Sequence, residues 1–128
     1  MIKVLVVDDS ALMRKHLTDL FESEGDYTVR TARNGVEALA ALDAFDPDVV
    51  TLDINMPEMD GITCLARIMQ QRPKPVLMVS SLTEEGAEAT LQALSLGAID
   101  FVHKPGGTIS LSIDQIRREI LVKVRESV

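Results

Sequence analysis

Short apolar runs alternate with helix-patterned segments along the whole chain, and this alternation restricts the fold more than any other feature. The runs are rich in β-branched residues and several stop at polar residues, which is typical of buried strands in a parallel sheet. The expected strands are Lys3–Val7, Tyr27–Thr31, Val49–Leu52, Val76–Val79 and Phe101–His103. Apolar and polar residues alternate more strongly in the second of these strands than in the others, so we expect this strand at an edge of the sheet.

The segments between the runs carry apolar residues at helical spacing. Ser10 stands where a helix N-cap is expected, and Gly35–Phe45 is expected to be helical throughout. The apolar stripes of the other four helices are Met13/Leu17/Leu20/Phe21, Ile62/Leu65/Ile68/Met69, Ala87/Leu91/Leu94/Ala98 and Ile113/Ile116/Ile120/Val124. Five strand–helix units joined by right-handed crossovers predict a doubly wound α/β sheet.

Composition supports one soluble domain over residues 1–128. Hydrophobic residues make up 46% of the chain, and 20 acidic against 13 basic residues give a net charge of −7, which argues against nucleic-acid or anionic-membrane binding. The single cysteine, Cys64, excludes an internal disulfide and is expected to be a small buried hydrophobe. No signal peptide is recognisable, and no apolar stretch approaches the roughly 20 residues of a membrane span, so we expect a cytoplasmic protein without membrane insertion.

Acidic residues follow two of the expected strands. Asp8 and Asp9 come directly after the first strand, and Asp53 comes directly after the third. Ligands of open α/β sheets bind beyond the carboxyl ends of the strands, so these side chains are expected to meet there. Three like charges repel one another unless a cation joins them, and carboxylate oxygens suit Mg²⁺. The sequence therefore predicts an acidic, magnesium-dependent site.

Two further strands bring a hydroxyl and an ammonium group to the same edge. Ser80 and Ser81 follow the fourth strand, and Lys104 follows the fifth. Aspartate can act as a nucleophile and form an acyl phosphate, and each equatorial oxygen of a transferred phosphoryl group needs a partner. The combination indicates phosphoryl transfer onto a carboxylate. Either serine could supply the hydroxyl, and we favour Ser80.

The same residues resemble the receiver domain of two-component response regulators. The resemblance covers essentially the whole chain and follows the order and spacing of the family. It is carried by Asp8-Asp9, the segment Asp53–Gly61, Ser80 and Lys104-Pro105. It implies a flavodoxin-like form of the (βα)₅ fold, with a parallel five-stranded sheet in the order 2-1-3-4-5.

The resemblance also implies a role for each site residue. Asp53 would be the phosphoacceptor. Asp9 would bind Mg²⁺ directly, Asp8 largely through water, and the backbone carbonyl of Asn55 would complete the protein ligands.

Three residues on the later strands receive roles in the same way. Lys104 would pair with the phosphoryl group. Ser80 would be the hydroxyl that moves toward that group, and Phe101 the aromatic side chain whose rotamer follows.

A finer resemblance points to the regulatory half of chemotaxis protein-glutamate methylesterases. It is carried by Pro75–Thr83, Ala89–Leu94, Gly97–Val102 and Lys104–Leu111. It implies a chemotaxis histidine kinase as phosphodonor and an effector methylesterase domain, a carboxylic ester hydrolase, in cis. That domain's serine nucleophile motif is absent from this sequence, so we expect a receiver that ends in or just before a linker. This fragment would catalyse only its own phosphorylation and dephosphorylation.

Two alternatives remain open on the sequence. A free-standing receiver would bind a separate target, such as a flagellar switch protein. An aspartyl phosphatase of the haloacid dehalogenase type would also use an aspartate, a lysine and Mg²⁺. Phosphatases of that type need a second aspartate two residues after the nucleophile, where this chain has Asn55, which cannot shuttle a proton.

Overall fold

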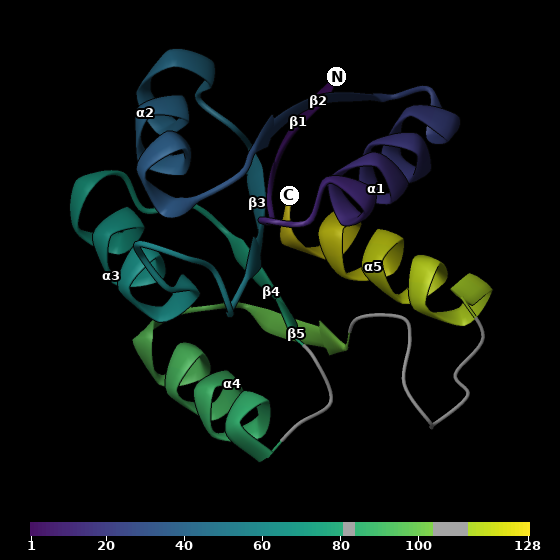
Figure 1. Cartoon of the computed structure of the whole chain (residues 1–128). Coiled ribbons are helices and arrows are strands. Elements are labelled where there is room, and N and C mark those ends of the chain that lie inside the picture. Colours follow the sequence, from purple (N-terminus) through teal and green to yellow (C-terminus); the bar gives the residue numbers. More distant parts are fainter. Residues whose placement is uncertain (81–83, 104–112) are drawn as a thin grey trace.

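The computed structural model describes residues 1–80, 84–103 and 113–128, with the backbone alone for residues 80, 84–87, 113 and 114. In this part of the chain, a parallel sheet has the strand order β2-β1-β3-β4-β5 (Figure 1). The strands are β1 (Ile2–Val7), β2 (Tyr27–Ala32), β3 (Val49–Asp53), β4 (Val76–Ser80) and β5 (Asp100–His103). The helices are α1 (Ala11–Glu24), α2 (Gly35–Phe45), α3 (Gly61–Gln71), α4 (Glu84–Leu96) and α5 (Ile113–Ser127). The doubly wound, flavodoxin-like fold, the strand order and the edge position of β2 are confirmed.

Strand boundaries differ from the prediction by about one residue, and β3 shows why. The prediction ended this strand at Leu52, where the apolar run stops. The ladder continues one residue further, because Asp53 still pairs with Val79 of β4. Backbone hydrogen bonds do not depend on side-chain polarity, so the acidic residue belongs to the strand itself.

Side-chain caps begin the three helices that follow the first three strands. Ser10 accepts a hydrogen bond from the Met13 N–H at the start of α1, as predicted. The caps of α2 and α3 are Asn34 and Asp60, whose side chains accept from the backbone N–H groups three residues further along. Each cap satisfies a backbone donor that the helix leaves open, so each helix starts at a defined residue directly after a loop that leaves the sheet.

The sheet separates the core into two halves (Figure 1). One face of the sheet packs against α2, α3 and α4, and the other packs against α1 and α5. Successive residues of β1 alternate between them: Leu5 contributes to the first half and Val4 to the second. Cys64 is fully buried in the first half, as predicted, and burial raises the pKa of its thiol to about 11. No described helix has the length and apolar character needed to cross a membrane.

Arg125 joins the last helix to the start of β2. Its guanidinium donates to both carboxylate oxygens of Asp26, at 2.9 and 3.0 Å, and lies 5.2 Å from the centroid of the Tyr27 ring. The hydrogen bond from Arg125 holds the pKa of Asp26 below its ordinary value. This contact fixes the end of α5 against a strand that lies about a hundred residues earlier in the chain.

Helix α1 allows a direct test of how much its buried face stabilises the fold. Leu20 is 3% exposed and Leu12 is 64% exposed, although both are leucines of the same helix. We expect Leu20→Ala to lower the free energy of unfolding by about 3 kcal/mol, because it removes buried methyl groups and leaves a cavity. Leu12→Ala should change it by less than about 0.5 kcal/mol. Urea unfolding followed by circular dichroism measures both, and equal losses would contradict the assigned packing of α1.

Candidate functional site

The end of β1 places one buried and one exposed carboxylate at the edge of the sheet. Asp8 is 1% exposed, and its N–H still donates to the Ala32 carbonyl of β2 at 3.1 Å. Its Oδ1 accepts a hydrogen bond from the Ser10 N–H at 2.9 Å, which fixes the side chain toward the start of α1. Asp9, the next residue, is exposed. The loop therefore holds one carboxylate rigidly and presents the other to solvent.

The end of β3 places a third carboxylate beside these two. Asp53 is the last residue of β3 and is 1% exposed. Its Oδ1 accepts a hydrogen bond from the Asn55 N–H at 3.3 Å. Because β1 and β3 are neighbours with Val7 opposite Leu52, the residues that follow this pair reach the same place.

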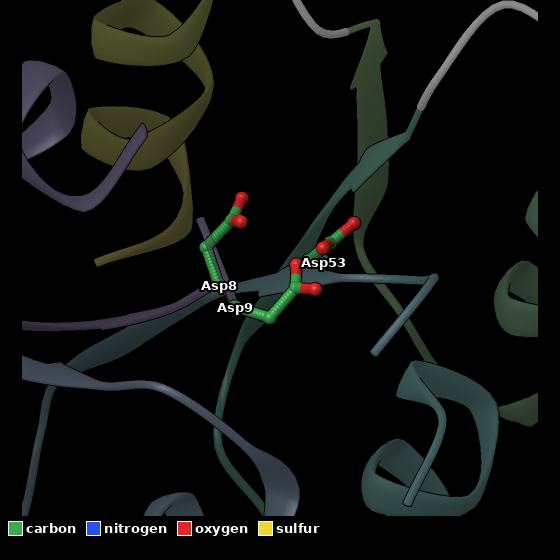
Figure 2. A group of neighbouring side chains, drawn as sticks. All are labelled: Asp8, Asp9 and Asp53. Atoms are coloured by element: carbon green, nitrogen blue, oxygen red, sulfur yellow. The ribbon is translucent and has the colours of Figure 1, made fainter. Parts of the chain in front are cut away.

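The three carboxylates form one cluster (Figure 2). One oxygen from each of Asp8, Asp9 and Asp53 lies within 4.8 Å of the others. Opposite ligands of Mg²⁺ are about 4.2 Å apart, so the three oxygens are close to the spacing that one small hard cation requires. The exposed position of Asp9 leaves one side open to water, which Mg²⁺ usually retains among its ligands. No other group of this kind occurs among the described residues.

The other predicted site residues are only partly within the described structure. Ser80 ends β4, and its backbone lies opposite His103 in β5. The Ser80 side chain, Ser81 and Lys104 lie outside the described residues. Asn55 is exposed beside the cluster, and the use of its carbonyl as a metal ligand stays a prediction.

The Phe101 side chain on β5 packs against the core and also borders an apolar hollow. The ring is partly buried against the core, and the Lys123 ammonium lies 5.6 Å from its centroid while donating to the Phe101 carbonyl at 2.8 Å. Together with Thr90, Leu91 and His103 the ring lines an apolar hollow of about 240 Å³. A change of the ring's rotamer would therefore have space to occur, and the switch role stays a prediction.

Comparison with known proteins decides the family. The sequence profile of the response regulator receiver domain matches residues 4–113, which is most of the chain. The chain belongs to the response regulator receiver family. The Thermotoga maritima CheB response regulator domain superposes on this receiver with a TM-score of 0.88 at 49% identity, over 99% of this chain and 96% of that domain. The Vibrio cholerae chemotaxis protein CheY4 gives 0.82 at 28% identity, over 100% and 99% of the two chains.

Full-length relatives are longer than this receiver. A protein-glutamate methylesterase/protein-glutamine glutaminase of Rhodospirillum rubrum is 69% identical over 97% of this chain, and one of Rhodopseudomonas palustris is 56% identical over 99%. The receiver covers 34% and 35% of these two proteins. It therefore spans about a third of the length of the curated relatives that it matches.

Gly61 supports the receiver site in a way that sequence reasoning missed. In the sequence, Gly61 stands out only as the last residue of the Asp53–Gly61 segment that carries the resemblance. A Cβ atom here would lie 2.1 Å from the Asp53 carbonyl oxygen and 2.7 Å from the Ile54 Cα, while the Gly61 N–H donates to the Ile54 carbonyl at 2.8 Å. The start of α3 thus packs directly on the backbone of the acidic strand end. The sequence marks this contact only by a glycine at the first position of a helix, and glycine also occurs at helix starts that touch no other backbone.

The contact at Gly61 predicts a strong effect of a single methyl group. Gly61→Ala should lower the free energy of unfolding by about 2 kcal/mol or more, because the added carbon forces the Asp53 backbone to move. Gly35→Ala is the matched control, since Gly35 is also the first residue of a helix. The nearest atoms to a Cβ atom there belong to the Met59 side chain, with Sδ at 2.7 Å and Cβ at 3.1 Å, and a side chain shifts more easily than backbone, so we expect a smaller loss of about 1 kcal/mol. Chemical denaturation together with the amide chemical shift of Asp53 distinguishes the two variants, and equal tolerance would refute the assigned contact.

Proposed function

We propose that this receiver accepts a phosphoryl group from a histidine kinase on the Asp53 carboxylate. The observation that supports the proposal most strongly is the cluster of three carboxylates within 4.8 Å at the carboxyl edge of the sheet. Asp53 is the member that stands alone on β3, whereas Asp8 and Asp9 are adjacent in the chain and suited to hold one ion together. Membership in the receiver family supports the same division of roles.

The chemistry is a nucleophilic displacement at phosphorus. An oxygen of Asp53 attacks the phosphorus of phosphohistidine, the new O–P bond forms, the N–P bond breaks, and the imidazole nitrogen keeps the electron pair and takes up a proton. Water later attacks the same phosphorus and releases inorganic phosphate, which restores the carboxylate. This cycle needs no substrate pocket, because the donor presents its phosphoryl group at the exposed side of the cluster.

The charges of the transferred group require partners from this chain. Asp8, Asp9, Asp53 and the Asn55 carbonyl would hold Mg²⁺, which when bound would neutralise part of the charge on the phosphoryl oxygens. Lys104 would pair with another of these oxygens, and Ser80 would donate its hydroxyl to the third. The composition of the cluster, three hard oxygen donors with one side open, supports this ion.

The new charge would then act as a switch. Movement of Ser80 and Lys104 toward the phosphoryl group would favour a second rotamer of Phe101 and so change the surface formed by α4, β5 and α5. The apolar hollow beside Phe101 supports this coupling, because it gives the ring room. Shifting such an equilibrium from about 1:99 to about 99:1 requires phosphorylation to favour the active state by about 5.5 kcal/mol.

Intact-mass measurement tests the phosphoacceptor. Incubation with acetyl phosphate and Mg²⁺ should add the mass of one phosphoryl group, and both EDTA and Asp53→Asn should abolish this adduct. Asp19→Asn is the matched control, because Asp19 is an exposed carboxylate on the surface of α1, where it pairs with Lys15. Its adduct should form as in the unsubstituted chain.

Two results of this measurement would count against the proposal. An adduct that persists in Asp53→Asn would place the chemistry on another residue. Absence of any adduct, both from acetyl phosphate and from a phosphorylated chemotaxis kinase, would remove the phosphoacceptor function altogether.

We further propose that the receiver regulates a methylesterase domain in the same protein, in a chemotaxis pathway of the cytoplasm. The support is the identity of 69% and 56% to proteins named protein-glutamate methylesterase/protein-glutamine glutaminase that are about three times as long. On this basis a free-standing receiver is not favoured. The aspartyl phosphatase is not favoured either, because Asn55 occupies the position of the required second acid.

The intact protein provides the test of this regulation. Phosphodonor and Mg²⁺ should raise the rate of methyl-ester hydrolysis on methylated chemoreceptor, since phosphorylation shifts the receiver toward its active state. Asp53→Asn should remove the stimulation, while Asp19→Asn should retain it. A phosphorylated intact protein whose hydrolysis rate is unchanged would contradict regulation in cis and leave the phosphoacceptor assignment intact.

A further inference from the structure

Arg14 contacts the backbone of the acidic loop from the first helix. Its Nη1 donates a hydrogen bond to the Asp8 carbonyl oxygen at 2.8 Å, in a partly buried position. Asp8 lies one residue beyond β1, and its N–H makes a last hydrogen bond to β2, at the Ala32 carbonyl. A buried carbonyl requires a donor, and here a charged side chain six residues later provides one.

The helix geometry explains why Arg14 reaches this carbonyl. The Arg14 N–H donates to the Ser10 carbonyl at 3.0 Å, so Arg14 stands one turn into α1. Side chains of a helix point back toward its N-terminus, which directs the long guanidinium arm toward the loop that precedes the helix. The cap at Ser10 fixes where α1 begins and thereby fixes the distance that Arg14 must span.

Asp8 is consequently held by three hydrogen bonds, one from β2 and two from the start of α1. Its N–H is bound by Ala32 of β2, its Oδ1 by the Ser10 N–H, and its carbonyl by Arg14 of α1. The first two contacts fix the entry to the loop and the carboxylate. The third fixes the peptide unit between Asp8 and Asp9, and with it the direction in which the exposed Asp9 leaves the loop.

The positive charge of Arg14 also acts on Glu37, a residue of the neighbouring helix α2. The pKa of Glu37 in α2 lies below its ordinary value, mainly because of hydrogen bonds from Arg33 and to a smaller extent because of the charge of Arg14. A guanidinium that binds the Asp8 carbonyl brings a positive charge to the acidic loop, and this charge by itself would oppose binding of a second cation. The orientation that Arg14 gives to the loop and the repulsion by its charge therefore act on Mg²⁺ binding in opposite directions.

We propose that Arg14 is a positioning residue that orients Asp8 and Asp9 for Mg²⁺. The inference rests on the proposed function, because it assumes that these carboxylates hold the ion. Mutation of a residue that hydrogen-bonds to a metal ligand typically lowers metal affinity by about 10–100-fold. If Arg14 positions the loop, removal of its guanidinium should weaken Mg²⁺ binding. If its charge only repels the ion, the same change should strengthen Mg²⁺ binding, so experiment can separate the two effects.

Mg²⁺ titration by calorimetry on the folded chain gives the required readout. Arg14→Met should weaken Mg²⁺ binding by about tenfold. Lys15→Met is the matched control, because it removes the same charge at the adjacent position, where the side chain is 72% exposed and pairs with Asp19 at 3.3 Å. Its Mg²⁺ affinity should stay within about twofold of the unsubstituted chain. In acetyl phosphate assays, Arg14→Met should raise the Mg²⁺ concentration for half-maximal rate more than it lowers the rate at saturating Mg²⁺.

Arg14→Lys provides a second variant if the methionine variant is poorly folded. Lysine keeps the charge, but its ammonium ends one bond short of the Nη1 position, so positioning predicts a severalfold weaker affinity and charge alone predicts no change. Unchanged or tighter Mg²⁺ binding in a folded Arg14→Met or Arg14→Lys would overturn the proposal. Absence of Mg²⁺ binding by the unsubstituted chain would instead overturn the metal assignment of the proposed function, and the positioning role with it.

Discussion

The pairing of β1 with β3 is the constraint on which the rest of the site depends. The register places Val7 opposite Leu52, so the next residues along the two strands are Asp8 and Asp53. Both strands are buried on both faces, and a shift of their register would move apolar side chains from one half of the core to the other. The hydrophobic packing of the sheet therefore holds together carboxylates that repel one another, and no interaction within the cluster is needed to align them.

Most of the fold and the acidic cluster could be predicted because they depend on local patterns. The β-branched run before Asp53, the cap at Ser10 and the apolar stripes all have signatures within a few residues of the chain. Contacts between distant segments have no such signature. The sequence does not show that Arg125 meets Asp26, because the two residues lie 99 positions apart and either could be an ordinary surface charge. It did not show that Gly61 lies on the Asp53 backbone either, because glycine also occurs at helix starts that touch no other backbone.

The residues missed at the site all act on the backbone of the acidic loops rather than on the ligand oxygens. Gly61 permits α3 to contact the end of β3, and Arg14 binds the carbonyl of Asp8. The carboxylates themselves can be identified in the sequence from their charge and position. Their supporting contacts cannot, because one depends on the absence of a side chain at Gly61 and the other is made to the main-chain oxygen of Asp8. A cluster of like charges remains ordered only when such contacts restrict its loops, so these positions are as important to the geometry as the acids.

The division of the core into two halves also affects how the chain is made. The half beneath α1 and α5 combines Val4 and Leu17, near the beginning of the chain, with Ile116 and Val124, near its end. The half that packs against α2, α3 and α4 uses residues from Leu5 to Phe101, so it is nearly complete in sequence before α5 is translated. On the ribosome, one face of the sheet can therefore close while the other stays exposed until the last helix emerges. The apolar surface of α1 must remain soluble during that interval, which makes the nascent chain most prone to aggregation just before its synthesis passes α5.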